Sequence, residues 1–236
     1  MNKKALVFMD YNETFDDIGG ERYNGFSNVF IGGIRQFCNQ FDNEVEIAVI
    51  TAANYQSPEA SIRSDLYCTL LYLPLDIRLH FKYLIEDCSQ YMSNIEFNGN
   101  DISYTHYQSI SHFRGTKKDG VENTLKAIDS NHEITTCVFV GDSETLDLPM
   151  IDAKVDNRTK FFILANKRIL KADRYPVYKV DIQKQSQSFS YGKDIIETIN
   201  PKEKEPLILK TTSKSFGVGK GFQALASYIK EKDREK

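Results

Sequence analysis

The sequence predicts an α/β protein built on a doubly wound, Rossmann-like parallel sheet. Short and mainly apolar segments at residues 5–9, 45–50, 137–140 and 161–165 have the length and composition of buried strands. Segments of helical length separate most of these strands. Strands that alternate with helices along the chain favour a parallel sheet with helices on both faces.

Composition narrows the class of protein. The chain has 236 residues, of which 41% are hydrophobic and 27% charged, so we expect one α/β domain over 1–236 with a small insertion. A net charge of -3 gives no electrostatic reason to expect nucleic acid or a membrane as partner. The start of the sequence has no apolar signal region, which predicts a cytoplasmic protein. The four widely spaced cysteines predict free thiols.

The first half of the chain carries strong boundary signals. Ser27 or Asn28 can cap a helix that runs to about residue 41, and the strand at 45–50 ends in Thr51. Ser57-Pro58 is typical of a helix start. We expect two helices from there, at about 58–73 and 75–91, separated near Pro74.

The second half begins with a predicted hairpin. Residues 94–104 alternate around Asn98-Gly99, a favoured two-residue turn, so we expect a hairpin insertion over approximately 92–113. Further elements are predicted in this order: a helix from 116 to 129, a strand at 137–141, a short helix at 146–151, strands at 161–165, 175–180 and 207–209, and a last helix at 218–231.

Polar side chains stand where three predicted strands end. Asp10, Thr51 and Asp142 take these positions, and the carboxyl ends of strands in a doubly wound sheet meet at one ligand-binding edge. Lys118 precedes a helix and can reach the same edge; Lys117 competes with it, but Lys118 has Leu125 seven residues on. Two carboxylates, a hydroxyl and a lysine are typical of metal-assisted phosphoryl chemistry, for which Mg²⁺ takes oxygen ligands.

These motifs, taken in order, resemble the haloacid dehalogenase (HAD) superfamily. The resemblance covers most of the chain and rests on Asp10-x-Asn12-x-Thr14, the strand-terminal Thr51, Lys118 and the segment GDSETLDLPM at 141–150. The segments at 148–151 and 216–221 look most like the Cof-type, sugar-phosphate-phosphatase branch of this superfamily.

The resemblance implies a role for each matching residue. Asp10 would be the nucleophile that forms an aspartyl-phosphate, and it would also bind Mg²⁺. Asn12 would bind Mg²⁺ through its backbone carbonyl, and Asp142 and Asp147 would complete the metal site. The side chains that would hold the phosphoryl oxygens are those of Thr14, Thr51 and Lys118. The expected partner is a phosphorylated small molecule.

Three departures from the family pattern affect the expected activity. Phosphatases of this superfamily carry an aspartate, the general acid and base, where this chain has Asn12, so turnover is expected to be slow. The segment after Thr51 lacks the arginine often found there in the Cof-type branch. Lys118 follows the Asn98-Gly99 turn within 20 residues, which leaves room for a reduced cap and predicts an open site.

The sequence therefore leaves two functions of different classes open. One is a Mg²⁺-dependent hydrolase, a phosphatase or phosphotransferase acting through Asp10. The alternative is a catalytically weak or inactive protein that binds a phosphorylated ligand or a protein partner. Non-phosphate chemistry at Asp10, as in dehalogenases, is disfavoured because Thr14, Thr51 and Lys118 are retained.

The glycine-rich segment at 217–221 invites a different interpretation. It fails the phosphate-loop pattern, because Lys214 stands where the first glycine belongs and Gly221 follows the lysine where Ser or Thr is required. We interpret this segment as a turn into the last helix.

Overall fold

The computed structural model describes residues 4–15, 26–52, 62–129, 132–155, 158–165, 177–180, 206–211 and 214–235. Nine strands within these ranges form one sheet, in the order β5-β4-β3-β2-β1-β6-β7-β9-β8. The strands are β1 (Lys4–Asp10), β2 (Val45–Ile50), β3 (Phe81–Glu86), β4 (Tyr91–Asn98), β5 (Asp101–Ser109), β6 (Ile134–Gly141), β7 (Thr159–Ala165), β8 (Val177–Val180) and β9 (Leu207–Thr211). Neighbouring strands are parallel except in the pairs β3–β4 and β4–β5.

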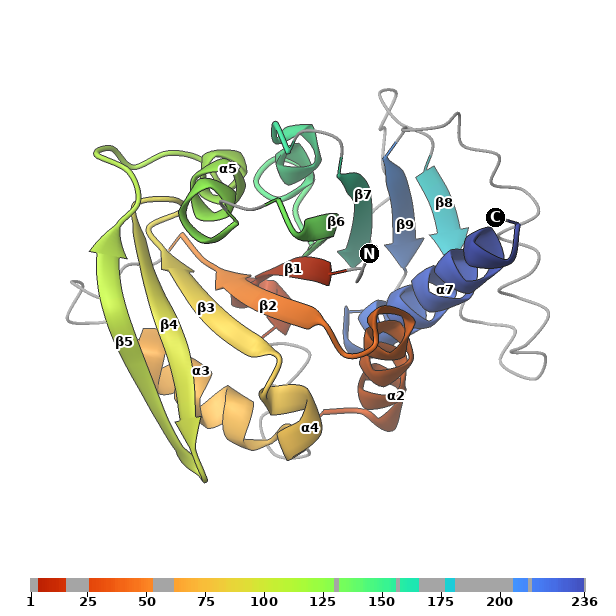
Figure 1. Cartoon of the computed structure of the whole chain (residues 1–236), viewed down its shortest axis with the longest axis horizontal. Helices are drawn as coiled ribbons and strands as arrows, with labels where there is room; N and C mark the ends of the chain where they lie inside the picture. Colours follow the sequence, from red (N-terminus) through yellow and green to blue (C-terminus); the bar gives the residue numbers. More distant parts are fainter. Residues whose placement is uncertain are drawn as a thin grey trace.

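Helices cover both faces of this sheet, with α5 on one side and α2 and α7 on the other (Figure 1). They are α2 (Asn28–Cys38), α3 (Ile62–Leu71), α4 (Leu75–Arg78), α5 (Lys117–Ile128) and α7 (Lys214–Arg234), with short turns η1 (Tyr11–Phe15), η2 (Asn39–Phe41) and η3 (Leu148–Asp152). The predicted fold class, a mainly parallel α/β sheet with helices on both faces, is confirmed. None of the described helices is both long enough and apolar enough to cross a bilayer.

Alternation along β1 divides the apolar core into two layers. Ala5, Val7 and Met9 belong to one buried cluster, which α2, α3 and α7 complete. Leu6 and Phe8 point the opposite way, into a second cluster completed by α5 and η3. Because side chains alternate along a strand, Asp10 lies on the same face as Leu6 and Phe8, toward α5.

The order of the strands places a switch point beside β1. From β1 the chain adds β2 and then β3 on one side, and it later crosses to β6 on the other side of β1. Open α/β sheets bind ligands at the carboxyl ends of their strands at such a point. Asp10 ends β1 and Asp142 directly follows β6, so these two carboxylates flank the switch point.

Local signals account for several element boundaries. Strand β2 has the predicted bounds, and α2 begins after Ser27, whose Oγ accepts a hydrogen bond from the amide of Phe30 at 3.1 Å. A capping box formed by Thr116 and Asp119 begins α5. These side chains satisfy helical amides that would otherwise have no partner.

The predicted helix at 75–91 is wrong. Helix α4 stops at Arg78, and β3 begins at Phe81 and pairs in parallel with β2. Leu84 and Ile85 are buried on opposite faces of the sheet, which suits a strand covered on both sides. The predicted helix start at 57–59 lies outside the described residues, and α3 is described from Ile62.

The predicted hairpin is confirmed. Asn98 ends β4 and pairs with Asp101, so the two turn residues are Gly99 and Asn100, one residue later than predicted, and Gly99 has a φ of 64°. Its first strand pairs with β3, so the hairpin extends the central sheet (Figure 1). The assignment of residues 92–113 as a reduced cap stays a prediction.

The interpretation of residues 217–221 as a turn is wrong, because they lie within α7. A Cβ added to Gly219 would lie 2.6 Å from the backbone of Val29, and one added to Gly33 would lie 2.2 Å from the carbonyl oxygen of Gly219. These glycines therefore permit close packing of α7 against α2.

Candidate active site

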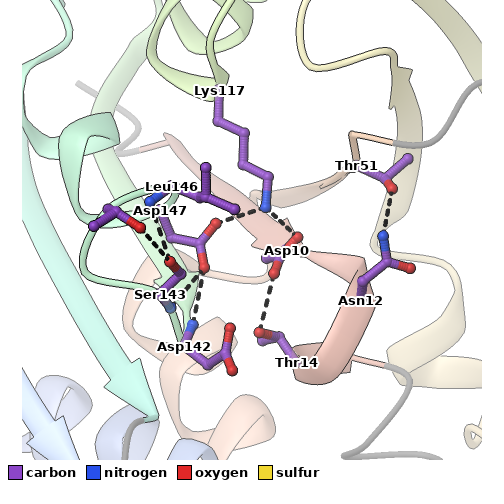
Figure 2. A network of polar contacts seen from close by, with 10 residues as sticks. Asp10, Asn12, Thr14, Thr51, Lys117, Asp142, Ser143, Leu146 and Asp147 are labelled. Atoms are coloured by element: carbon purple, nitrogen blue, oxygen red, sulfur yellow. Dashed lines mark hydrogen bonds and ion pairs between the residues drawn. The ribbon is translucent and has the colours of Figure 1, made fainter.

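The carboxylate of Asp10 is the centre of a polar network at the end of β1 (Figure 2). Only 3% of Asp10 is exposed. Its Oδ1 accepts a hydrogen bond from the ammonium of Lys117, and its Oδ2 accepts one from the hydroxyl of Thr14 at 3.2 Å. These two hydrogen bonds therefore fix the orientation of the Asp10 carboxylate.

Lys117 is the lysine that reaches this carboxylate. It is the first residue of α5, and its ammonium also donates to Oδ1 of Asp147 at 2.6 Å (Figure 2). The expected placement of Lys118 at this site is wrong, because the buried face of α5 consists of Lys117, Gly120, Val121, Thr124 and Leu125. Leu125 does lie on the buried face, but the lysine that shares this face is eight residues before it, not seven.

Asp147 organises the loop after β6. Its side chain is fully buried, and its Oδ2 accepts hydrogen bonds from the amides of Asp142 at 3.0 Å and Ser143 at 2.9 Å. Ser143 Oγ in turn accepts from the amide of Leu146 at 3.1 Å. The loop therefore wraps around the Asp147 carboxylate (Figure 2).

Gly141 makes this wrapping possible. A Cβ at position 141 would lie 2.4 Å from Cβ of Asp147, closer than two carbon atoms can approach. The contribution of Ser143 was missed in the sequence, and no signal there reveals it, because its backbone amide does the binding.

The three aspartates form a compact cluster of oxygen ligands. One carboxylate oxygen from each of Asp10, Asp142 and Asp147 lies within 4.8 Å of the other two. The ammonium of Lys117 contacts two of these three carboxylates, those of Asp10 and Asp147. Hard divalent cations such as Mg²⁺ prefer carboxylate oxygens, so the donor set and its excess negative charge fit such an ion.

The electrostatics of the cluster match its burial. Burial raises the pKa of Asp10 well above its ordinary value, the neighbouring Asp147 raises it further, and Lys117 opposes the increase. Burial alone would lower the pKa of Lys117, but the carboxylates of Asp10 and Asp147 outweigh it, so that pKa is raised. A cation bound at the cluster would favour the ionised form of Asp10.

Asn12 and Thr51 form a second contact at the same edge. Asn12 is exposed in η1, and its Nδ2 donates to Thr51 Oγ1 at 3.2 Å (Figure 2). Thr51 is fully buried, its amide donates to the carbonyl of Ile85 at 2.9 Å, and its carbonyl accepts from the amide of Cys88 at 2.8 Å. The ends of β2 and β3 therefore hold Thr51 beside Asn12.

The structure thus brings together six of the seven residues predicted for the site, in two adjacent contacts. The Asp10 network contains Thr14, Asp142 and Asp147, and the second contact joins Asn12 to Thr51 (Figure 2). The seventh position, Lys118, is replaced by Lys117. The roles of these residues in chemistry remain predictions.

Comparison with known proteins gives only distant likenesses. No protein-family profile matches the sequence, and no curated protein matches it. Among solved structures, the IMP-nucleotidase of Plasmodium falciparum is 13% identical, with a TM-score of 0.40 over 61% of this chain and 60% of its own. An N-terminally truncated form of that nucleotidase is 17% identical, with a TM-score of 0.31 over 56% of this chain and 38% of its own.

A third solved structure is similar over a longer stretch. The cobalt-bound deoxy-D-mannose-octulosonate 8-phosphate phosphatase of Haemophilus influenzae is 14% identical, with a TM-score of 0.41 over 98% of this chain and 88% of its own. Because all three TM-scores are below 0.5, these likenesses do not decide the family or the activity.

Proposed function

We propose that this chain is a Mg²⁺-dependent hydrolase of the HAD type, which transfers phosphoryl groups through Asp10. The observation that carries the proposal is the buried Asp10 carboxylate, held by Lys117 and clustered with Asp142 and Asp147 at the switch point of the sheet. A nucleophile, a cation and an oxygen-rich metal site together are the parts that phosphoryl transfer requires. The proposed substrate is a phosphorylated small molecule.

Three carboxylates and one backbone group would hold the metal ion. Asp10 and Asp142 offer carboxylate oxygens, Asn12 offers its backbone carbonyl, and Asp147 lies close enough to assist. A bound Mg²⁺ supplies charge neutralisation, so that a phosphate dianion can approach an aspartate. The fit rests on the oxygen-only donor set and its excess negative charge.

The proposed reaction has two displacements at phosphorus. First, Asp10 forms a new oxygen–phosphorus bond while the ester bond breaks, and the leaving alcohol oxygen takes up a proton from solvent water. Water then attacks the aspartyl-phosphate, which releases inorganic phosphate, restores the carboxylate and returns a proton to solvent. Lys117 provides positive charge beside Asp10, and Thr51 offers a hydroxyl to the phosphoryl oxygens.

Asn12 limits the rate in this proposal. An amide cannot deliver a proton to the leaving group or remove one from water, and such acid–base help is typically worth about 10²–10⁴ in rate. Asn12 instead donates a hydrogen bond to Thr51. Asn12→Asp would place a carboxylate at the same position, two residues after the nucleophile.

The same residue favours one alternative function. A site that keeps its carboxylate cluster and its phosphate-binding groups but lacks an acid–base group suits a protein that binds a phosphorylated ligand without turning it over.

The finer assignment to the Cof-type branch rests on residues 148–151 and 216–221 alone. Two glycines of the second segment, Gly219 and Gly221, have a packing reason in α7, because an added Cβ would lie 2.6 Å from Val29 and Ile163, respectively.

The test is phosphatase activity on a panel of phosphate esters, with and without Mg²⁺. The proteins are the natural chain, Asn12→Asp and Asp10→Ala. We expect slow, Mg²⁺-dependent turnover by the natural chain, an increase of about tenfold or more in Asn12→Asp, and none in Asp10→Ala. If all three are silent while Mg²⁺ still binds, the ligand-binding alternative replaces the hydrolase.

A further inference from the structure

One arginine outside the Asp10 network lies across the same edge of the sheet. Arg114 precedes α5, three residues before Lys117. Its Nη2 donates to the carbonyl of Ala52 at 3.2 Å, and its Nε lies 2.8 Å from Oδ1 of Asp87. Ala52 follows Thr51 and Asp87 follows β3, so this guanidinium spans the carboxyl ends of β2 and β3.

The backbone around Arg114 is held in place. The amide of Gly115 donates to Ser89 Oγ at 2.9 Å, and Thr116 caps α5. The facing turn after β3 has Asp87 and Cys88 at φ values of 54° and 62°, a conformation that residues other than glycine rarely adopt. Because the amide of Cys88 also donates to the carbonyl of Thr51, the turn ties the loop of Arg114 to the site.

The guanidinium of Arg114 is exposed to solvent. The side chain of Arg114 is 61% exposed, whereas that of its partner Asp87 is 9% exposed. A guanidinium carries five N–H donors, and these two contacts use only two of its nitrogens. Pairing with the buried Asp87 accounts for the Nε edge of the guanidinium, whereas Nη1 takes part in neither contact.

Arg114 and Lys117 come from the same short stretch of chain. Lys117 is the first residue of α5, and Arg114 precedes it by three residues. The two cations differ in their partners. Lys117 is buried between Asp10 and Asp147, whereas Arg114 faces solvent.

We infer that Arg114 recognises a second anionic group on the substrate, a carboxylate or a second phosphate on the alcohol that leaves. The inference rests on the proposed function, because it requires the phosphoryl group to lie at Asp10, and it places the anionic end of the leaving group beside Ala52 and Asp87, where Arg114 is held. An arginine fork that is fixed at one edge and open at the other suits bidentate binding of such an anion. The substrate class is then phosphate esters of acidic alcohols or bisphosphates.

The experiment compares two esters that share a carbon skeleton, 3-phosphoglycerate and glycerol 3-phosphate. The first has a carboxylate where the second has a hydroxymethyl group. Values of kcat/KM are measured with Mg²⁺ for the natural chain and Asn12→Asp, each with and without Arg114→Gln. Arg35→Gln is the matched control, because Arg35 forms an exposed ion pair with Asp76 on α2 and α4.

We expect about a tenfold or greater preference for 3-phosphoglycerate, carried by KM, which Arg114→Gln removes and Arg35→Gln retains. Equal kcat/KM values for the two esters would overturn the inference but leave the hydrolase standing. The same holds if Arg114→Gln lowers both values by the same factor, since that is a purely structural effect.

A binding measurement separates the inference from the proposed function. Calorimetry with Asp10→Asn and Mg²⁺ measures affinity for both esters without turnover. Selective binding of 3-phosphoglycerate that depends on Arg114, with no turnover by the natural chain or Asn12→Asp, would support the anion site and reject the hydrolase. If neither ester is bound or hydrolysed, both ideas fail.

Discussion

Lys117 is the single residue on which the charge balance of the site depends. Its side chain is 6% exposed, and its ammonium lies between the carboxylates of Asp10 and Asp147, which are buried as well. Removing one partner from a buried ion pair typically costs about 3–5 kcal/mol, because the remaining charges lose their compensation. The neighbouring Lys118 lies outside the buried face of α5 that carries Lys117.

The first prediction compares Lys117→Met with Lys118→Met. We expect Lys117→Met to lower the free energy of unfolding by about 3 kcal/mol in the absence of divalent cations. Lys118→Met should change it by less than about 0.5 kcal/mol. Urea denaturation followed by circular dichroism gives both values, and equal effects of the two substitutions would show that Lys117 is not the compensating charge.

The same pair of lysines shows how far the sequence predicts the site. Asp10, Thr51 and Asp142 could be found because each follows an apolar strand, and strand ends of a parallel sheet meet at one edge. The choice between Lys117 and Lys118 depends on which face of α5 is buried. The sequence alone does not decide this, because the two lysines are adjacent. The backbone amides of the loop after β6 have no sequence signal.

At the scale of elements, the sequence predicts best where local signals and tertiary packing agree. The strand at Val45–Ile50 and the hairpin that turns at Gly99 were found because an apolar run or a turn-forming glycine defines each, although the turn lies one residue later than predicted. The segment Phe81–Glu86 was predicted as helix because short apolar runs suit either structure. Pairing with β2 makes this segment a strand, and β2 is far enough away in the sequence that local patterns do not reveal the pairing.

Two adjacent glycines in α2 provide the second prediction. A Cβ at Gly33 would meet the carbonyl oxygen of Gly219 in α7 at 2.2 Å, whereas a Cβ at Gly32 has nothing within 4 Å. We expect Gly33→Ala to destabilise the protein by about 1–3 kcal/mol, because α2 and α7 must separate. Gly32→Ala should stabilise it by about 0.5–1 kcal/mol, because alanine is the better helix former.

Thermal unfolding of the two variants measures this difference. The substitutions are identical and lie one residue apart in the same helix, so helix propensity contributes about equally to both. A loss of stability in Gly32→Ala of the same size as in Gly33→Ala would contradict the packing argument. It would mean that the helix itself, rather than its contact with α7, requires glycine.

At the scale of the whole molecule, the site exists only when the sheet is assembled. Lys117 and Asp10 are 107 residues apart in the sequence, and Asp142 arrives from the strand on the other side of β1. The three carboxylates therefore form a cluster in the folded chain only. A cation that binds this cluster must bind the folded state in preference to the unfolded chain, so binding and global stability are linked.

The third prediction follows from this linkage. We expect Mg²⁺ at about 100 times its dissociation constant to stabilise the folded chain by about 2.7 kcal/mol. Titrations at constant ionic strength, with K⁺ replaced by Mg²⁺, separate this specific effect from general screening of charge. The melting temperature is the measurement, and Asp142→Asn should remove most of the increase.

Asp101→Asn is the matched control for that titration, because it removes one negative charge from the exposed start of β5. It should leave the increase intact, since it lies outside the cluster of Asp10, Asp142 and Asp147. An equal response to Mg²⁺ in Asp142→Asn and Asp101→Asn would mean that the ion acts on net charge. A response lost only in Asp142→Asn assigns the binding to the cluster, and this result holds whether or not the chain turns over a phosphate ester.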